Sequence, residues 1–103
     1  MKYTLVFHPD VEEDVLLSYN WYETKSTGLG EELLRIFYGH ASELSKTPLS
    51  WQKVEGECRR RLLRRFPFAI YYLIREQQVI VIGLFHTARD PGTIRKIVNR
   101  RSQ

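Results

Sequence analysis

The spacing of apolar residues changes near residue 48, and this change most constrains the fold. Between residues 11 and 44, apolar residues recur at intervals of three and four, which is the period of a helix. After residue 57 they form short runs rich in β-branched and aromatic side chains, which is typical of strands. One more strand-like run, residues 2–7, precedes the helical part. Helices and strands that are segregated in this way predict a domain of the α+β class.

Two helices are predicted in the first half. The first begins at His8-Pro9-Asp10 and ends near Lys25, with an apolar stripe of Val11, Val15, Leu16, Tyr19 and Tyr22. The second begins at residues 28–30 and ends before Thr47-Pro48, because proline cannot continue a helix. Its apolar face comprises Leu29, Leu33, Leu34, Ile36, Phe37, Ala41 and Leu44. The turn between them is short, which predicts an antiparallel helical hairpin.

The second half predicts an antiparallel meander of three strands. They cover residues 58–65, 68–75 and 79–85, and the connections between them are short enough for hairpin turns. Residues 79–82 are apolar on both faces, which indicates a central, covered strand. Residues 48–57 are expected to form a loop, and a short helix is expected at 93–100.

The predicted order is therefore β-α-α-β-β-β in a single domain, residues 1–103. The N-terminal strand joins the meander, and the helical hairpin packs on one face of the sheet. The arginines of the second half are expected on the other face or at the strand ends.

Charge is divided unevenly along the chain. Residues 1–57 carry five Lys/Arg against ten Asp/Glu, whereas residues 58–103 carry eleven against two. All but one of those eleven cations are arginine, whose planar guanidinium binds phosphates and carboxylates through two hydrogen bonds. A solubilising surface would account for the overall charge of +4. The steep segregation indicates more than that, a basic surface that binds a polyanion or an acidic partner.

The densest basic feature is the run from residue 59 to residue 65. If it is a strand, alternation places Arg59, Arg61 and Arg65 on one face and Arg60 and Arg64 on the other. One interpretation is an edge strand protected by charge. The other is a cationic groove for phosphate or for an acidic segment.

The three histidines are scattered along the chain. His86 follows the last central strand, where it can act as a general acid or base or can hydrogen-bond the following turn. His8 is expected at the helix entry and His40 on the helix surface. Their spacing does not match a metal site, so no metal and no cofactor are predicted. Cys58 is expected to behave as a small apolar residue.

The chain is expected to be cytosolic. It has a single cysteine, and no apolar run reaches the roughly 20 residues of a membrane span. The first residues lack the apolar length and cleavage site of a signal peptide. No membrane association is predicted.

Four motifs, in this order and spacing, resemble one known family. They are Trp21-Tyr22-Glu23, Gly28-Leu29-Gly30, Arg64-Arg65-Phe66-Pro67-Phe68-Ala69-Ile70-Tyr71-Tyr72 and His86-Thr87-Ala88-Arg89-Asp90-Pro91. Together with the predicted element order, they make residues 3 to about 94 similar to the RelE/ParE superfamily of bacterial toxins. The resemblance implies the toxin of a type II toxin–antitoxin pair, held inactive by a cognate antitoxin encoded beside it.

The resemblance leaves two activities open. ParE-like members inhibit DNA gyrase and so replication, whereas RelE-like members cleave messenger RNA in the ribosome without a metal. The Phe-Pro-Phe turn and the His-x-Ala-Arg-Asp segment are in the style of the ParE branch. A third possibility is a decayed toxin that only binds its antitoxin.

A ribonuclease would need a base, an acid and cations for the phosphorane charge. His86, Arg61, Arg65 and Arg89 are the candidate catalytic residues for that reading. The resemblance to RelE-like enzymes implies a tyrosine or a histidine–tyrosine pair near the C-terminus and lysines or a glutamate on the neighbouring strand. The tail from residue 87 has no tyrosine, and the strand at 58–65 has no lysine or glutamate, so that set is incomplete. Glu55 or Glu57 remains a candidate partner for His86.

Binding residues can be proposed for either target. The expected contacts to target or antitoxin are Arg59, Arg60, Arg61, Arg64, Arg65, Arg75, His86 and Arg89. The apolar seam of the helical hairpin is expected to accept an amphipathic antitoxin segment. The arginine-rich strand is expected to accept acidic residues or an added strand. DNA gyrase is the expected target, with the ribosome and messenger RNA as the alternative. A toxin dimer and a toxin–antitoxin heterotetramer both stay open.

Overall fold

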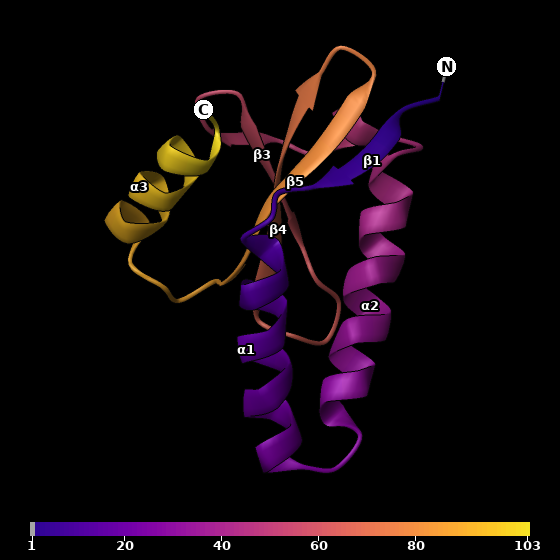
Figure 1. Cartoon of the computed structure of the whole chain (residues 1–103), viewed down its shortest axis with the longest axis vertical. Coiled ribbons are helices and arrows are strands. Elements are labelled where there is room, and N and C mark those ends of the chain that lie inside the picture. Colours follow the sequence, from indigo (N-terminus) through magenta and orange to yellow (C-terminus); the bar gives the residue numbers. More distant parts are fainter. Residues whose placement is uncertain (1) are drawn as a thin grey trace.

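The computed structural model describes residues 2–103. One five-stranded sheet lies between a helical hairpin and a third helix (Figure 1). The elements are β1 (Thr4–Phe7), α1 (Val11–Lys25), α2 (Leu29–Leu44), a 3-10 turn (Pro48–Ser50), β2 (Lys53–Glu55), β3 (Cys58–Leu62), β4 (Phe68–Arg75), β5 (Gln78–His86) and α3 (Pro91–Arg101). The expected α+β class, the helical hairpin and the three-strand meander are confirmed.

The spatial order of the strands is β1-β5-β4-β3-β2. β4 and β5 are antiparallel, with Phe68 opposite His86 at one end and Arg75 opposite Gln78 at the other. β1 pairs in parallel with β5, so β5 lies between two strands, as its continuous apolar run predicts.

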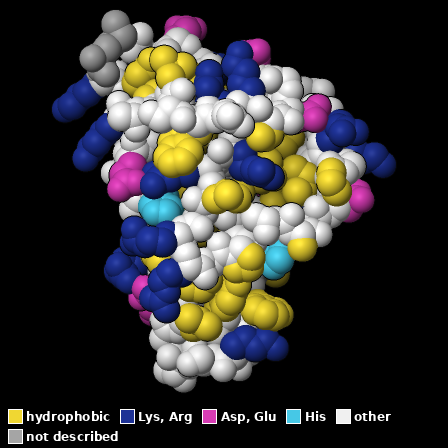
Figure 2. All heavy atoms as spheres, turned by 180° about the vertical axis from the view of Figure 1, so that it is seen from behind, with side chains coloured by type: hydrophobic (Ala, Val, Ile, Leu, Met, Phe, Trp, Pro, Cys, Tyr) yellow, Lys and Arg dark blue, Asp and Glu magenta, His cyan; other side chains and the backbone are white. Residues whose placement is uncertain are grey.

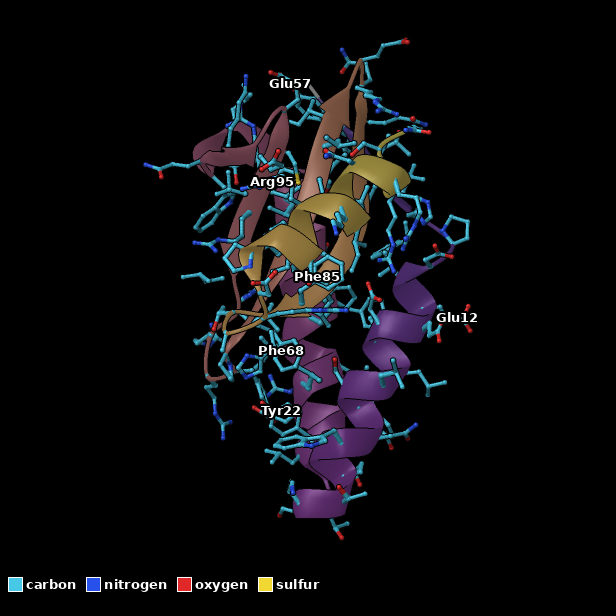
Figure 3. The ribbon with its side chains drawn as sticks, turned by 90° about the vertical axis from the view of Figure 1, so that its left-hand side faces the viewer. Glu12, Tyr22, Glu57, Phe68, Phe85 and Arg95 are labelled. Atoms are coloured by element: carbon cyan, nitrogen blue, oxygen red, sulfur yellow. The ribbon has the colours of Figure 1, made fainter. Side chains whose placement is uncertain are left out.

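Successive residues of β4 belong to two different cores. Ile70 and Tyr72 pack with the α1–α2 hairpin, whereas Ala69, Tyr71 and Leu73 pack with α3. Figure 3 shows α3 crossing in front of the strands. The expectation that arginines line the second face is therefore wrong over much of that face. α3 covers it with Ile94 and Val98, which are both buried.

The hairpin packs through a narrower seam on α1 than predicted. Val11, Val15 and Ser18 are buried, and Tyr22 continues the same line at helical spacing. Leu16 falls outside this line and is 54% exposed, so its place in the stripe is wrong. The predicted face of α2 is confirmed at Leu33, Ile36, Phe37, Ala41 and Leu44.

Residues 48–57 are not a plain loop. They form the 3-10 turn and β2, which pairs antiparallel with β3 and takes the sheet edge. β3 ends at Leu62, three residues earlier than predicted. The chain turns there, and Arg65 adopts a left-handed backbone with φ of 73°. Arg64 and Arg65 therefore lie outside the strand.

Candidate functional site

The arginines predicted as one surface are dispersed by the fold. Alternation along β3 is confirmed, because Arg59 and Arg61 lie opposite hairpin-side residues of β4 and Arg60 lies opposite Tyr71, on the α3 side. Figure 2 shows basic side chains in several separate groups over one face of the molecule, with apolar side chains exposed between them.

Arg61 and Arg59 attach the segment after α2 to the rest of the domain. The Arg61 side chain is only 11% exposed, and its guanidinium lies 2.6 Å from the Glu43 carboxylate. It also donates to the His40 carbonyl at 3.1 Å and lies 4.7 Å from the Trp51 ring centroid. Arg59 donates to the Trp51 carbonyl. Both cations are engaged within the domain, which is a structural role.

His40 is buried, with 6% of its surface exposed, so the expected surface position is wrong. It lies one turn beyond Phe37 and next to Ala41 on the buried face of α2, beneath Arg61. Burial, followed by the charge of Arg61, lowers the pKa of the imidazole. His40 is therefore held neutral.

The remaining predicted cations point elsewhere. Arg65 pairs with Glu32 of α2 at 2.6 Å. Arg64 follows the end of β3 at Leu62 and lies in the turn before β4. Arg75 lies at the opposite end of β4 and donates to the Ser102 carbonyl. None of these three residues lines the concave surface that Arg60 lines.

His86 accepts a hydrogen bond from the turn that follows it, which is one of the two roles predicted from the sequence. Its Nδ1 accepts the Ala88 N–H at 3.0 Å, and its ring lies 5.1 Å from that of Phe68. An accepting Nδ1 places the proton of the neutral ring on Nε2. Glu55 lies on the other face, opposite Cys58 of the α3 core, and pairs with Arg95 at 3.1 Å. The proposed pairing of His86 with Glu55 is therefore not observed.

Glu57 does not complete an acid–base pair either, since its carboxylate is 3.0 Å from Lys53. Cys58 is 1% exposed, and burial raises the pKa of its thiol to about 12. A thiol in that state is not a nucleophile, which agrees with the expected apolar role.

His86 belongs to an exposed aromatic patch beside the hairpin. The patch is lined by Leu17, Ser18, Trp21, Tyr22, Phe68 and His86. Figure 3 shows Tyr22 of α1 next to Phe68 of β4. Trp21 is 55% exposed, whereas Tyr22 packs edge-on against Phe66 at 4.9 Å.

The first two sequence motifs hold the hairpin together. The Glu23 carboxylate accepts the Gly30 N–H at 2.7 Å. A Cβ at Gly30 would lie 2.7 Å from Tyr19 and Glu23 side-chain atoms, so only glycine permits this close approach. Glu23 and Gly30 therefore pack the two helices together, whereas Trp21 and Tyr22 of the first motif line the aromatic patch.

A second concave surface, the basic pocket, lies on the α3 side of the sheet. It has a volume of about 150 Å³ and is lined by Val54, Glu55, Arg60, Tyr71, Thr87, Arg89, Pro91, Ile94 and Arg95. Arg60 and Arg89 were expected from the sequence, whereas Arg95 was not. Arg95 lies on α3, and the sequence does not predict which face of the sheet α3 packs against.

The most buried ion pair also joins distant segments. Arg101 of α3 lies 2.6 Å from the Asp14 carboxylate of α1, and their side chains are 9% and 11% exposed. Arg101 also donates to the Ile82 carbonyl at 3.0 Å and lies over the Phe85 ring. No spacing rule connects residues 87 positions apart.

Across residues 2–103, no cluster of three or more His, Cys, Asp or Glu side chains is arranged to hold a metal ion. Among the helices described, none is both long and apolar enough to cross a membrane.

Comparison with known proteins identifies the fold. No protein-family model matches the chain, and no curated protein matches it. A solved structure titled "Chromosomal ParDE TA system from P. aeruginosa" contains a similar chain, with a TM-score of 0.75 and 11% identity. The match covers 82% of this chain and 96% of that one. The protein therefore has the α+β fold of that toxin–antitoxin structure, as the resemblance in sequence implies.

Proposed function

We propose that this protein is a ParE-like toxin of a type II toxin–antitoxin system that inhibits DNA gyrase. The observation that carries the proposal is the fold match, which covers 96% of a chain from a ParDE system. The sequence motifs, in the style of the ParE branch, support it independently. An antitoxin encoded beside the toxin is the partner that this function requires.

The arrangement of titratable groups supports inhibition by binding over catalysis. Metal-independent RNA cleavage needs a base and an acid on either side of one phosphate. His86 lies beside α1 residues on the hairpin side, while Glu55 is on the α3 side and paired with Arg95. Arg61 and Arg65, two of the cations proposed for cleavage, are paired with Glu43 and Glu32.

A supercoiling assay with purified gyrase tests the target. We expect loss of supercoiling and trapped cleavage complexes as toxin is added in excess, and none when toxin is first mixed with its antitoxin. Normal supercoiling at toxin excess would refute gyrase as the target. Codon-linked cuts in primer extension after induction would instead establish the ribonuclease, and induction without a growth defect would indicate a decayed toxin.

The antitoxin is proposed to occupy the outer groove of the hairpin. This groove is lined by Glu12, Val15, Leu16, Tyr19, Glu31, Leu34 and Tyr38. Leu16 and Tyr38 are half exposed, which suits the apolar side of an amphipathic segment. The arginine-rich β3 lies between β4 and β2, so an added strand would pair with one of the two edge strands, β1 or β2, and not with β3.

Charge-reversal variants can distinguish which basic surface attracts the antitoxin. We expect association to slow as salt rises, because long-range attraction is screened. Arg60→Glu changes β3 on the α3 side of the sheet, whereas Arg64→Glu changes the turn after β3, so stopped-flow rates for each variant identify which of the two positions contributes. Rates that are insensitive to salt and to both reversals would exclude a basic landing surface.

A further inference from the structure

One side of α1 carries a row of four exposed side chains, the α1 ridge. Its members are Glu13, Leu17, Trp21 and Lys25, which follow one another at intervals of four residues and so form one continuous line on the helix. Leu17 is 64% exposed and Trp21 is 55% exposed, and both border the aromatic patch. A contiguous apolar surface of this kind marks an interaction site. We propose that the α1 ridge is the interface of a symmetric dimer of this protein.

The order of side chains along the α1 ridge is self-complementary. It reads acid, apolar, apolar, base, so the same ridge running in the opposite direction matches it. A twofold axis between Leu17 and Trp21 places Glu13 of each copy opposite Lys25 of the other. It also packs Leu17 of each copy against Trp21 of the other. Reciprocal contacts of this kind are what twofold symmetry requires of a dimer interface.

The two charges at the ends of the α1 ridge are not used within the domain. In residues 2–103, neither Glu13 nor Lys25 takes part in an ion pair, whereas Lys53 and Glu57, at the same spacing, lie 3.0 Å apart. The Lys25 ammonium lies 4.6 Å from the Trp21 ring centroid. Both charges are therefore available to a second copy. A parallel arrangement would instead bring like charges together, which disfavours it.

The surface beside the α1 ridge has the shape to accept a bulky side chain. The aromatic patch forms a hollow of about 390 Å³ between α1, β4 and β5, and Leu17 lines it. The twofold axis brings Trp21 of the second copy over Leu17 and hence to the edge of this hollow. Ridges built from every fourth residue pack together at about −50°, the commonest angle between helices in globular proteins.

The α1 ridge is separate from the outer groove proposed for the antitoxin. Glu12 and Leu16 line the outer groove, whereas their chain neighbours Glu13 and Leu17 belong to the α1 ridge. Figure 3 shows Glu12 leaving α1 on one side and Tyr22 on the other, towards Phe68. The inference therefore goes beyond the proposed function and does not depend on the target. The neighbouring residues also provide matched controls.

Sedimentation of the full-length protein over a range of concentrations tests the apolar part of the interface. A contact formed by one ridge and its surroundings is small, so we expect a monomer–dimer equilibrium with Kd of about 10 µM. Leu17→Gln should raise this Kd about tenfold, because both copies lose the contact. Leu16→Gln changes a leucine of similar exposure on the outer-groove side and should raise it less than about twofold.

Charge exchange tests the antiparallel arrangement. Glu13→Lys and Lys25→Glu each turn both attractive pairs into repulsive ones, so each should raise Kd about tenfold. An equimolar mixture of the two variants should dimerise like the wild type, because the new lysine of one faces the new glutamate of the other. Glu12→Lys alters the net charge as Glu13→Lys does and should leave the dimer unchanged.

The outcomes decide the proposal as follows. Weaker dimers in the ridge variants, wild-type behaviour in both controls and recovery in the mixture support it. A wild-type protein that stays monomeric at about 200 µM overturns it. Equal or larger losses in Leu16→Gln would place the contact in the outer groove and overturn it, and so would a mixture that does not recover. Unfolding midpoints confirm that each variant is folded, and the gyrase assay is read separately.

Discussion

The arginines of this protein differ in role according to what faces them. Arg101 is enclosed by the Asp14 carboxylate, the Ile82 carbonyl and the Phe85 ring. Its positive charge is therefore compensated within the fold. Arg60, in contrast, faces an open pocket. Residue type alone does not distinguish a structural arginine from a binding one.

Replacing Arg101 with alanine should strongly destabilise the fold. Asp14 would remain buried without its partner, and breaking a buried ion pair from one side costs about 3–5 kcal/mol. Urea unfolding measures the loss, with the exposed neighbour change Arg100→Ala expected within about 0.5 kcal/mol of wild type. A double variant with Asp14→Asn should lose less than the sum of the two single changes. Strict additivity would show that the pair is not coupled.

His40 should make stability depend on pH. Burial and Arg61 lower its folded pKa, and Arg64 acts in the same direction against the opposing charge of Glu43. The unfolded chain, with a histidine pKa of about 6.5, then binds the proton more readily. The free energy of unfolding should therefore fall as pH drops through 6.5 towards the folded pKa.

The matched variant for this prediction is His40→Gln. Its unfolding free energy, from urea titrations between pH 7.5 and pH 5, should decline less than that of the wild type. Parallel curves for wild type and His40→Gln would contradict the assignment.

Among the helices and strands, the start of α3 is fixed by its N-cap residue, Asp90. Asp90 accepts the Thr93 N–H at 2.9 Å, and Pro91 occupies the first helical position. The final residues of the His-Thr-Ala-Arg-Asp-Pro motif therefore start a helix. This start also sets the position of Arg95 over β2 and hence the shape of the basic pocket.

Removing the cap should loosen α3 in a measurable way. Asp90→Ala should lower the free energy of unfolding by about 1 kcal/mol, because the Thr93 N–H loses its acceptor. Asp90→Ser should retain most of the stability, since a hydroxyl can accept the same bond. Equal losses for alanine and serine would show that the cap does not stabilise the helix. Chemical denaturation followed by circular dichroism gives the comparison.

At the scale of the whole molecule, β4 and β5 are shared by both cores. Tyr72 and Val81 belong to the hairpin core, while Tyr71 and Phe85 belong to the α3 core. Opening either helical layer leaves these strands covered on one face. They should therefore form the most stable part of the domain.

Native-state hydrogen exchange tests this hierarchy. The amides at the centre of β4 and β5 should exchange only through global unfolding. The amides of α3 should exchange at least about tenfold faster, through a local opening that leaves the hairpin core intact. Equal protection in α3 and β4 would mean that the two layers unfold as one unit.

The spacing of apolar residues was sufficient to predict those elements whose apolar residues follow one another closely in the chain. The hairpin, the meander and the covered position of β5 follow from spacing at three to four residues or from runs apolar on both faces. The helix at the C-terminal end was predicted as an element, but its docking was not. Its apolar residues Ile94 and Val98 are few, and the pattern does not tell which face of the sheet they cover.

Composition and apolar spacing are sufficient to predict the fold class, the order of the main elements and the excess of arginine in the second half. Which of those arginines are available for binding depends on contacts between distant segments. Arg61 has a structural role because the fold places Glu43 beside it. Arg60 lines a pocket because α3 packs on the same side of the sheet and contributes Arg95 to that pocket. Such pairings join residues far apart in the chain, and local propensity and spacing carry no information about contacts of that kind.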